Sequence, residues 1–217
     1  MPEPDTPAQR VATALAKIGL ALRTQAWEEA GRRGLTPTQG QVLAVVHARG
    51  PARIGAVARE VGVTSATISD SVSALEAKGL IRRRSLPHDG RAVEVRLTGR
   101  GRRIAVSAAA WPDAIADAVG SLPSAEQTTM LRALVGVIRM LQDTGRIPVA
   151  RMCVSCRYFA PHVHDDPAFP HHCRFVDARF GDRSLRIDCA DFDAAPATQA
   201  ADGLSAVLTV RTPGGSP

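Results

Sequence analysis

The 217-residue sequence has no apolar run that approaches the roughly 18 residues of a membrane-spanning helix. Its first residues, MPEPDTPAQR, lack the basic-then-apolar order of a signal peptide. The sequence also contains no phosphate-binding loop, no dinucleotide-binding motif and no nucleophile elbow. We therefore expect a cytoplasmic protein that has no membrane partner and is not an enzyme.

Aromatic residues are few and unevenly distributed. Of the eight Phe, Trp and Tyr residues, only Trp27 and Trp111 precede residue 150, and the other six lie between Tyr158 and Phe192. Proteins that read RNA or single-stranded DNA stack bases on aromatic side chains. The first part of the chain lacks such a platform, so double-stranded DNA is the better candidate for a nucleic-acid partner.

Residues 57–103 have the pattern of a helix-turn-helix. A first short helix ends at Gly62, which is free to adopt the positive φ of a sharp turn. Thr64 is a good N-cap for a second helix that runs to Lys78. Most outward positions of the second helix are small and polar, and its apolar positions recur at helical spacing. The predicted buried stripe consists of Ile68, Val72 and Leu75.

After the second helix the periodicity changes from helix to strand. Residues 93–97 alternate between apolar and polar, as in a half-buried strand, and residues 81–85 supply a partner. The connection between them contains Pro and the turn pair Asp89-Gly90. The sequence therefore predicts a β-hairpin, or wing, directly after the second helix.

Positive charge is concentrated in the same region. From Lys78 to Arg103, nine basic residues oppose two acidic ones, which gives +7 (9 − 2), against +6 for the whole chain. Such a cluster is typical of a surface that binds phosphates. The alternative to a phosphate-binding surface is an ordinary solvent-exposed charged face. The protein is rich in arginine throughout, since 25 of its 27 basic residues are Arg.

These residues resemble the MarR family of winged-helix transcriptional regulators. The resemblance covers roughly residues 8–145 and is most specific over residues 67–102. At Asp70 the sequence departs from the family, which usually has a basic residue there. The matching pieces are Leu35-Thr36-Pro37-Thr38-Gln39, Thr67-Ile68-Ser69, Leu75-Glu76-Ala77-Lys78-Gly79-Leu80-Ile81, Asp89-Gly90-Arg91, Val95-Arg96-Leu97-Thr98 and Gly101-Arg102.

The resemblance implies a homodimer that binds duplex DNA carrying an inverted repeat, and it leaves room for a small-molecule effector. Side chains of the second helix would contact bases in the major groove. Arg91 would reach the minor groove from the wing tip, with Asp89 orienting it, and other arginines would bind phosphates. The major-groove residues are Ser65, Thr67, Ser69 and Ser71, and the phosphate-binding residues are Arg82, Arg83, Arg84 and Arg96.

Further helices are predicted on both sides of the winged helix. They begin at the N-cap signals Thr6, Thr36 and Thr98, and a last helix between residues 124 and 143 has a wide apolar face. In the MarR family the first and last helices form the dimer, whereas the simplest alternative is packing within the monomer. We expect a mainly α fold with a small β-hairpin wing, in which residues 6–146 form the DNA-binding and dimerisation domain.

All four cysteines lie in one segment, with the spacing Cys153-x2-Cys156-x16-Cys173-x15-Cys189. In a reducing compartment this indicates metal or redox chemistry rather than structural disulfides. Because a loop-rich piece of about 40 residues has too small a core to fold unaided, a metal staple is expected. We predict a cysteine-rich metal-binding module over residues 149–193, with these four cysteines as ligands, and a flexible tail over residues 194–217.

The identity of the metal centre stays open between a zinc ion and an iron–sulfur cluster. Zinc is common in four-cysteine sites, but those sites usually have two close pairs, and here fifteen residues separate the second pair. One close pair with two isolated cysteines near several aromatic residues also suits a cluster, and the spacing looks like that of high-potential iron–sulfur proteins. The alternatives to a metal are cysteines packed as small hydrophobic residues and a redox Cys-x-x-Cys. The segment also holds four histidines that we expect outside the ligand set, His162, His164, His171 and His172.

The sequence predicts a homodimeric, sequence-specific transcriptional regulator that senses metal or redox state through its cysteine centre. The alternative is a redox or electron-transfer protein, or an enzyme, in which the winged helix serves only protein contacts. The sequence does not indicate the operator, the effector, or whether binding represses or activates transcription.

Overall fold

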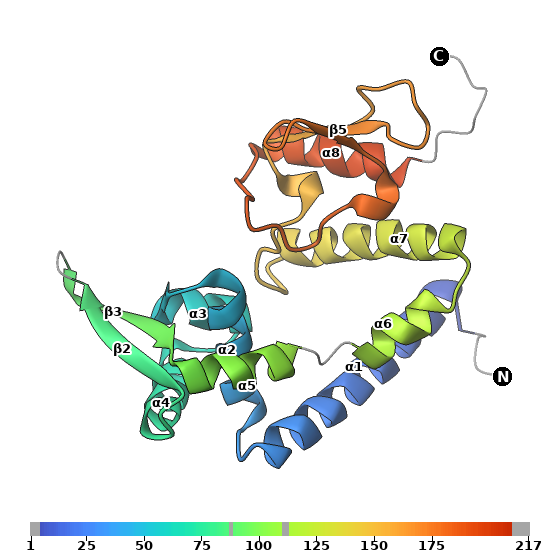
Figure 1. Ribbon diagram of the computed structural model, residues 1–217. Coiled ribbons are helices and arrows are strands. Elements are labelled where there is room, and N and C mark those ends of the chain that lie inside the picture. Colours follow the sequence, from blue (N-terminus) through green and yellow to red (C-terminus); the bar gives the residue numbers. More distant parts are fainter. Residues whose placement is uncertain (1–4, 87–88, 110–112, 210–217) are drawn as a thin grey trace. The chain divides into compact units, whose positions relative to one another are not determined.

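The computed structural model describes residues 5–86, 89–109 and 113–209, and the chain forms two compact units, residues 1–117 and 118–217 (Figure 1). The last predicted helix of the MarR-like part groups with the cysteine-rich segment in the second unit. This division differs from the predicted boundary near residue 146. The reason is that one face of this helix packs on the cysteine-rich segment, as described below. None of the helices in the described part of the chain combines the length and apolarity needed to cross a membrane.

The first unit begins with two long helices, α1 (Pro7–Arg32) and α2 (Pro37–Arg49). Thr6 and Thr36 each cap a helix through a reciprocal capping box, with Gln9 and Gln39 as partners. A helix α6 (Asp113–Gly120) crosses the boundary between the units. The predicted N-cap residues of α1 and α2, Thr6 and Thr36, are confirmed.

The helix-turn-helix consists of α3 (Ile54–Val61) and α4 (Ser65–Ala77). Gly62 ends α3 with a φ of 74°, a left-handed conformation that favours glycine, and the Thr64 side chain caps α4. The stripe predicted on α4 is fully buried, because Ile68, Val72 and Leu75 are 0% exposed. These side chains join residues of α2 and α3 in one apolar core. Burial of this stripe leaves the opposite face of α4 toward solvent.

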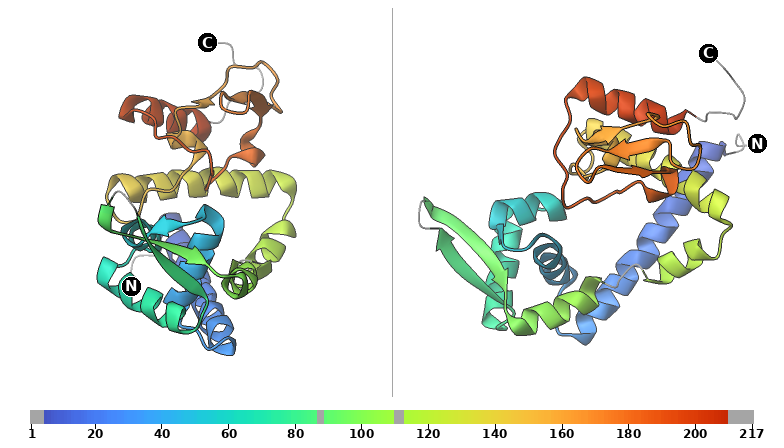
Figure 2. Two further views of the ribbon diagram at one scale, coloured as in Figure 1. Left: turned by 60° about the vertical axis from the view of Figure 1, so that its left-hand side comes forward. Right: turned by 45° about the horizontal axis from the view of Figure 1, so that its top comes forward.

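The wing follows as β2 (Ile81–Leu86) and β3 (Asp89–Leu97), paired antiparallel. The hairpin projects from the helices of the first unit in Figure 1 and in the right-hand view of Figure 2. A two-residue strand, β1 (Ala52–Arg53), pairs with the other edge of β3, so the strand order is β1-β3-β2. The hairpin is confirmed, whereas β1 was missed because two residues are too few to display an alternation.

The second unit combines two helices with a small sheet. Helix α7 (Ser124–Asp143) is followed by a turn η1 (Cys153–Ser155), the strands β4 (Phe159–Ala160), β5 (His171–Cys173) and β6 (Ala178–Phe180), a turn η2 (Asp182–Ser184) and α8 (Ala197–Leu208). The strands pair antiparallel in the order β4-β5-β6. The predicted flexible tail is wrong for residues 197–208, because α8 buries Ala200, Gly203 and Val207.

Gly101 lies at a close approach between α5 (Gly99–Ala109) and the start of the wing. The hydroxyl of Thr98 caps this junction, accepting from the amide of Gly101 and donating to the carbonyl of Gly79. A Cβ atom added at Gly101 would lie 1.8 Å from the carbonyl oxygen of Leu80, a separation that no small adjustment of a side chain relieves. The position therefore requires a residue without a side chain.

We predict that Gly101→Ala destabilises the first unit by about 1–3 kcal/mol, the usual effect of overpacking. Gly99→Ala is the matched control, because nothing lies within 4 Å of its added Cβ atom. The measurement is urea unfolding followed by circular dichroism. Equal midpoints for the two variants would contradict the close approach described here.

Candidate DNA interface and candidate metal centre

The outward face of α4 carries small polar side chains. Ser65, Thr67 and Asp70 are exposed, and Ser69 is half-buried. Ser71, which we predicted as a base contact, is only 9% exposed and lies beside Ile68 and Val72 on the inward side. Its burial argues against such a contact, because residue 71 is one helical turn from residues 68 and 75 and shares their buried face.

Arg83 ties the wing to α4. Its guanidinium donates to the carbonyl of Ser69 at 3.1 Å and to the hydroxyl of Ser73 at 2.5 Å. It also lies 3.5 Å from the carboxylate of Glu76, which accepts a bond from the Arg83 backbone amide. Arg83 therefore positions β2 against α4, a role that its place in the sequence did not reveal.

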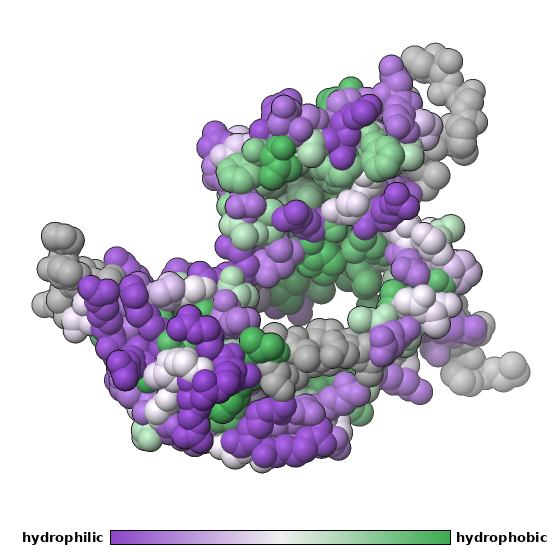
Figure 3. All heavy atoms as spheres, viewed as in Figure 1, coloured by the Kyte–Doolittle hydropathy of each residue, from purple (hydrophilic) through white to green (hydrophobic). Residues whose placement is uncertain are grey.

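The other predicted phosphate-binding residues are placed on the two long strands of the wing. Arg82 and Arg84 are exposed on β2, while Arg96 on β3 forms a 2.6 Å ion pair with Glu94. In the antiparallel pairing of β2 with β3, Arg82 lies opposite Arg96 and Arg84 lies opposite Glu94. The wing and the neighbouring surface are mainly hydrophilic in Figure 3. The side chains of Asp89 and Arg91 lie outside the described residues.

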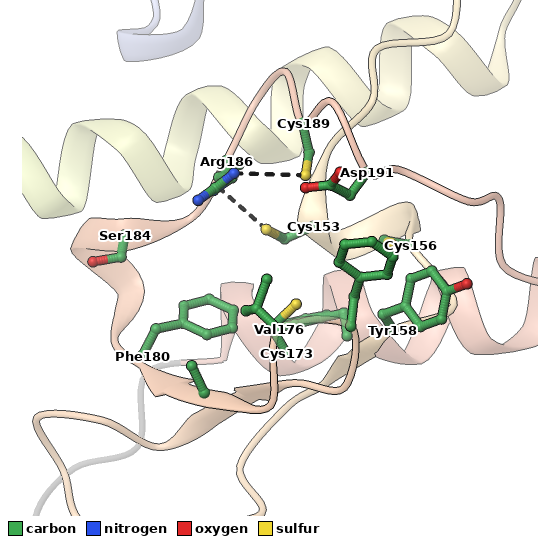
Figure 4. A pocket seen from close by; sticks show the side chains of 13 residues that line it. Cys153, Cys156, Tyr158, Cys173, Val176, Phe180, Ser184, Arg186, Cys189 and Asp191 are labelled. Atoms are coloured by element: carbon green, nitrogen blue, oxygen red, sulfur yellow. Dashed lines mark hydrogen bonds between the residues drawn. The ribbon is translucent and has the colours of Figure 1, made fainter.

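The four cysteines come together around one cavity of about 190 Å³ in the second unit (Figure 4). Cys153 lies in η1, Cys156 directly after it, Cys173 at the end of β5, and Cys189 in the segment that follows η2. All four are free and half-buried. The sequence correctly grouped residues that are up to 36 positions apart (189 − 153).

Arg186 donates two hydrogen bonds to sulfur atoms of this cavity. Its backbone amide lies 3.3 Å from Sγ of Cys153, and its Nη1 lies 3.9 Å from Sγ of Cys189. Burial raises the pKa of the Cys153 thiol above its ordinary value, and the Arg186 amide opposes that rise. Sequence reasoning missed Arg186 because nothing in its spacing distinguishes it from the other arginines.

The rest of the cavity wall is largely aromatic and aliphatic. Tyr158 packs on Phe175 with ring centroids 5.3 Å apart, and Phe159 packs on Phe180 at 5.9 Å. Arg186 and Asp191 also line the cavity. Within the described residues, no three Cys, His, Asp or Glu side chains form a group tight enough to hold one metal ion.

The histidines make a separate network, and none of those in the segment lines this cavity. The buried His171 lies 2.7 Å through Nε2 from Asp182, and its Nδ1 accepts a 3.4 Å bond from the amide of His162. Burial lowers the pKa of His171, although Asp182 acts in the other direction. A neutral ring that donates through Nε2 fits both bonds. His164 and His172 form a second pair at 3.2 Å.

Helix α7 packs directly on the cysteine-bearing segment. Its residues Leu131, Val135 and Ile138 contribute to the same apolar core as Met152, Val154 and the Cys153 side chain. Two arginines of α7 add polar contacts to this core. Arg139 donates to the Ser155 hydroxyl at 3.1 Å, and Arg132 donates to the carbonyl of Val207 at 2.8 Å and lies 3.4 Å from Asp182.

The other side of α7 is also apolar. Val137, Met140 and Leu141 are 41%, 67% and 38% exposed. Hydrophobic side chains gather along α7 in Figure 3. The helix therefore has two apolar faces, of which the described residues of its own unit cover one.

A helix-turn-helix followed by a wing defines a winged-helix domain, and comparisons with known proteins specify its type. Residues 33–92 match the sequence model of the MarR family. This part of the chain therefore resembles the MarR family in sequence, and its fold is a winged helix. A comparison with curated proteins gives no match.

Several solved structures share the fold. A DNA complex of FabT from Streptococcus pneumoniae has a TM-score of 0.56 and 24% identity, and the match covers 63% of this chain and 99% of that one. The DNA complex of MepR from S. aureus has a TM-score of 0.53 and 22% identity, covering 60% and 97%. NadR in complex with 4-hydroxyphenylacetate has a TM-score of 0.51 and 21% identity, covering 64% and 97%. More than a third of this chain therefore lies outside each match.

We predict that Arg83→Ala destabilises the first unit by about 0.5–1 kcal/mol, since it removes partly exposed hydrogen bonds that hold the wing on α4. Arg84→Ala is the matched control, because Arg84 is an exposed arginine of the same strand. The measurement is thermal unfolding of both variants at one salt concentration. If the two melt at the same temperature, the bonds of Arg83 to α4 do not contribute in solution.

Proposed function

We propose that this chain is a homodimeric, sequence-specific transcriptional regulator that binds duplex DNA through α4 and the wing. The observation that carries the proposal is the exposed polar face of α4 beside the exposed arginines of β2, in a MarR-type winged helix. Ser65, Thr67 and Ser69 would read base edges, and Arg82 and Arg84 would bind phosphates. Arg83 would act by positioning the wing, and Arg91 would contact the minor groove.

The proposed dimer would bury apolar surfaces on the first helix and on α7. Leu20 and Trp27 on α1 are 60% and 59% exposed and are seven residues apart, which places them on one side of the helix. The outer face of α7 is apolar as well, through Val137, Met140 and Leu141. Exposed apolar surfaces of this kind are typical of association sites.

The four cysteines would hold a metal centre, either a zinc ion or an iron–sulfur cluster, and its state would change DNA affinity. The ligand-bearing turn η1 contacts α7 through the apolar core and through the bond from Arg139 to Ser155. Since α7 would also form part of the dimer, loss of the metal would alter the spacing of the two recognition helices. A small-molecule effector fits this proposal too, because NadR, which shares the fold, has been solved with 4-hydroxyphenylacetate.

A redox or electron-transfer protein is the second candidate function. It is favoured by the cavity that gathers all four cysteines, whereas the winged helix would then serve only protein contacts. The two candidates differ in one measurable property, because only the regulator requires salt-dependent binding of duplex DNA.

We predict that the protein prefers an inverted repeat with half-sites about 10 base pairs apart and that its affinity falls steeply with salt. Arg82→Ala and Arg84→Ala should each lower the slope of log affinity against log salt by about 1, as expected for a lost phosphate contact. Arg183→Ala, an exposed arginine of the second unit, is the control for net charge. The measurement is fluorescence anisotropy with labelled duplexes selected from a random library.

Equal affinity for single-stranded DNA and for the selected duplex would contradict the proposed function. An equal loss of slope with Arg183→Ala would show that the net charge of the protein, rather than the wing, determines the salt dependence.

We predict that removal of the metal changes operator affinity by roughly 5- to 150-fold, the range of ordinary allosteric coupling. Arg139→Ala should reduce this difference, because it removes a contact between α7 and the ligand-bearing turn. Arg146→Ala, an exposed arginine beyond the end of α7, is the control. Affinity is measured for the metal-loaded and chelated full-length forms of each variant.

Equal affinities of the two wild-type forms would leave the metal with a purely structural role. A full metal effect in Arg139→Ala would locate the coupling elsewhere in the second unit.

A further inference from the structure

We propose that the four-cysteine cavity binds a cluster of four irons and four sulfides rather than a single zinc ion. This assignment deepens the proposed metal centre and rests on it. It is independent of DNA binding, which depends on residues of the first unit.

The spacing of the sulfur atoms argues against a single ion. A zinc ion with four thiolates at about 2.3 Å requires every pair of sulfurs to lie within roughly 4 Å, by tetrahedral geometry. The described residues contain no group of three or more Cys, His, Asp or Glu side chains placed to hold a single ion, although all four cysteines line one cavity. Figure 4 shows the sulfur atoms of Cys153, Cys173 and Cys189 at separate places around this cavity. A cubane cluster, which carries an iron at each of four corners, needs ligands arranged in this way.

The size of the cavity supports the same assignment. Its volume is about 190 Å³. A void of roughly 150 Å³ accommodates a benzene-sized ligand, so this cavity has room for a compact polyatomic group. A single zinc ion would fill little of this volume, because its four ligands contact the ion directly.

The wall of the cavity also has the chemistry that such a cluster needs. Aromatic rings of Tyr158, Phe159, Phe175 and Phe180 line it, and Phe159 is buried. Two N–H groups of Arg186 donate to Sγ of Cys153 and Sγ of Cys189, at 3.3 and 3.9 Å. Hydrogen bonds to ligand sulfurs stabilise their negative charge, and together with solvent exclusion they adjust the reduction potential of a cluster. Arg186 is therefore a positioning residue for the bound group.

The cavity offers a way to separate a cluster from an ion by mutation. Ala178 on β6 lines it and pairs directly with Cys173 on β5. The next residue, Arg179, lies on the other face of the strand and does not line the cavity. A larger side chain at residue 178 would occupy space that a cluster needs and a single ion does not.

The test is metal and acid-labile sulfide analysis, with an absorption spectrum, on full-length protein purified anaerobically from iron-supplemented cells. We expect about four irons and four sulfides per chain and a brown protein whose visible absorption bleaches on reduction. Ala178→Leu should lose most of its iron and sulfide, whereas Arg179→Leu should retain both. Circular dichroism of each variant reports whether the second unit remains folded.

Each other outcome has a definite meaning. One zinc per chain without sulfide would overturn the cluster and leave the metal centre in place, since zinc is colourless and d¹⁰. About two irons and two sulfides would overturn the four-iron assignment. Four titratable thiols without metal in freshly purified, folded protein would overturn the metal centre as well. Operator binding by the same samples reports separately on the proposed regulator.

Discussion

Packing of one face of α7 on the cysteine-bearing segment is the contact on which the second unit depends. The segment has only three strands of two or three residues and two single-turn helices, too little to form a core of its own. Leu131, Val135 and Ile138 supply the apolar surface that it lacks, and α8 packs beside them. Arg132 and Arg139 fix the register of this packing through Asp182, Val207 and Ser155.

The same packing gives α7 a second role. A helix with one apolar face covers one partner, whereas α7 has apolar residues on both sides and exposes Val137, Met140 and Leu141. If that outer face forms the proposed dimer, the cysteine-bearing turn η1 and the dimer lie on opposite sides of one helix. A shift of α7 would then reach the partner subunit without any signal having to pass through the winged helix.

In the first unit the decisive constraint is burial of the α4 stripe. With Ile68, Val72 and Leu75 inside, the positions that face solvent are fixed by helical geometry. The wing is attached to that helix by Arg83 and to α5 by the Thr98 and Gly101 junction. Presentation of the polar face of α4 and orientation of the wing are therefore set by the same small group of contacts.

The sequence by itself determined the elements with a local physical cause. Capping by Thr6, Thr36 and Thr64, the turn at Gly62, the buried stripe of α4 and the hairpin all follow from residues a few positions apart. The sequence also indicated that the four cysteines lie together, because a loop-rich segment with so small a core needs a cross-link to fold.

Tertiary structure alone decided what depends on distant contacts. Only the fold buries Ser71, ties Arg83 to α4 and places Arg186 against two of the sulfurs. Strand β1 and helix α8 form because β3 and η1 offer them partners, not because their own patterns are strong. The width of the cysteine cavity is likewise set by where η1, β5 and the segment after η2 meet, a separation in space that residue spacing along the chain does not encode.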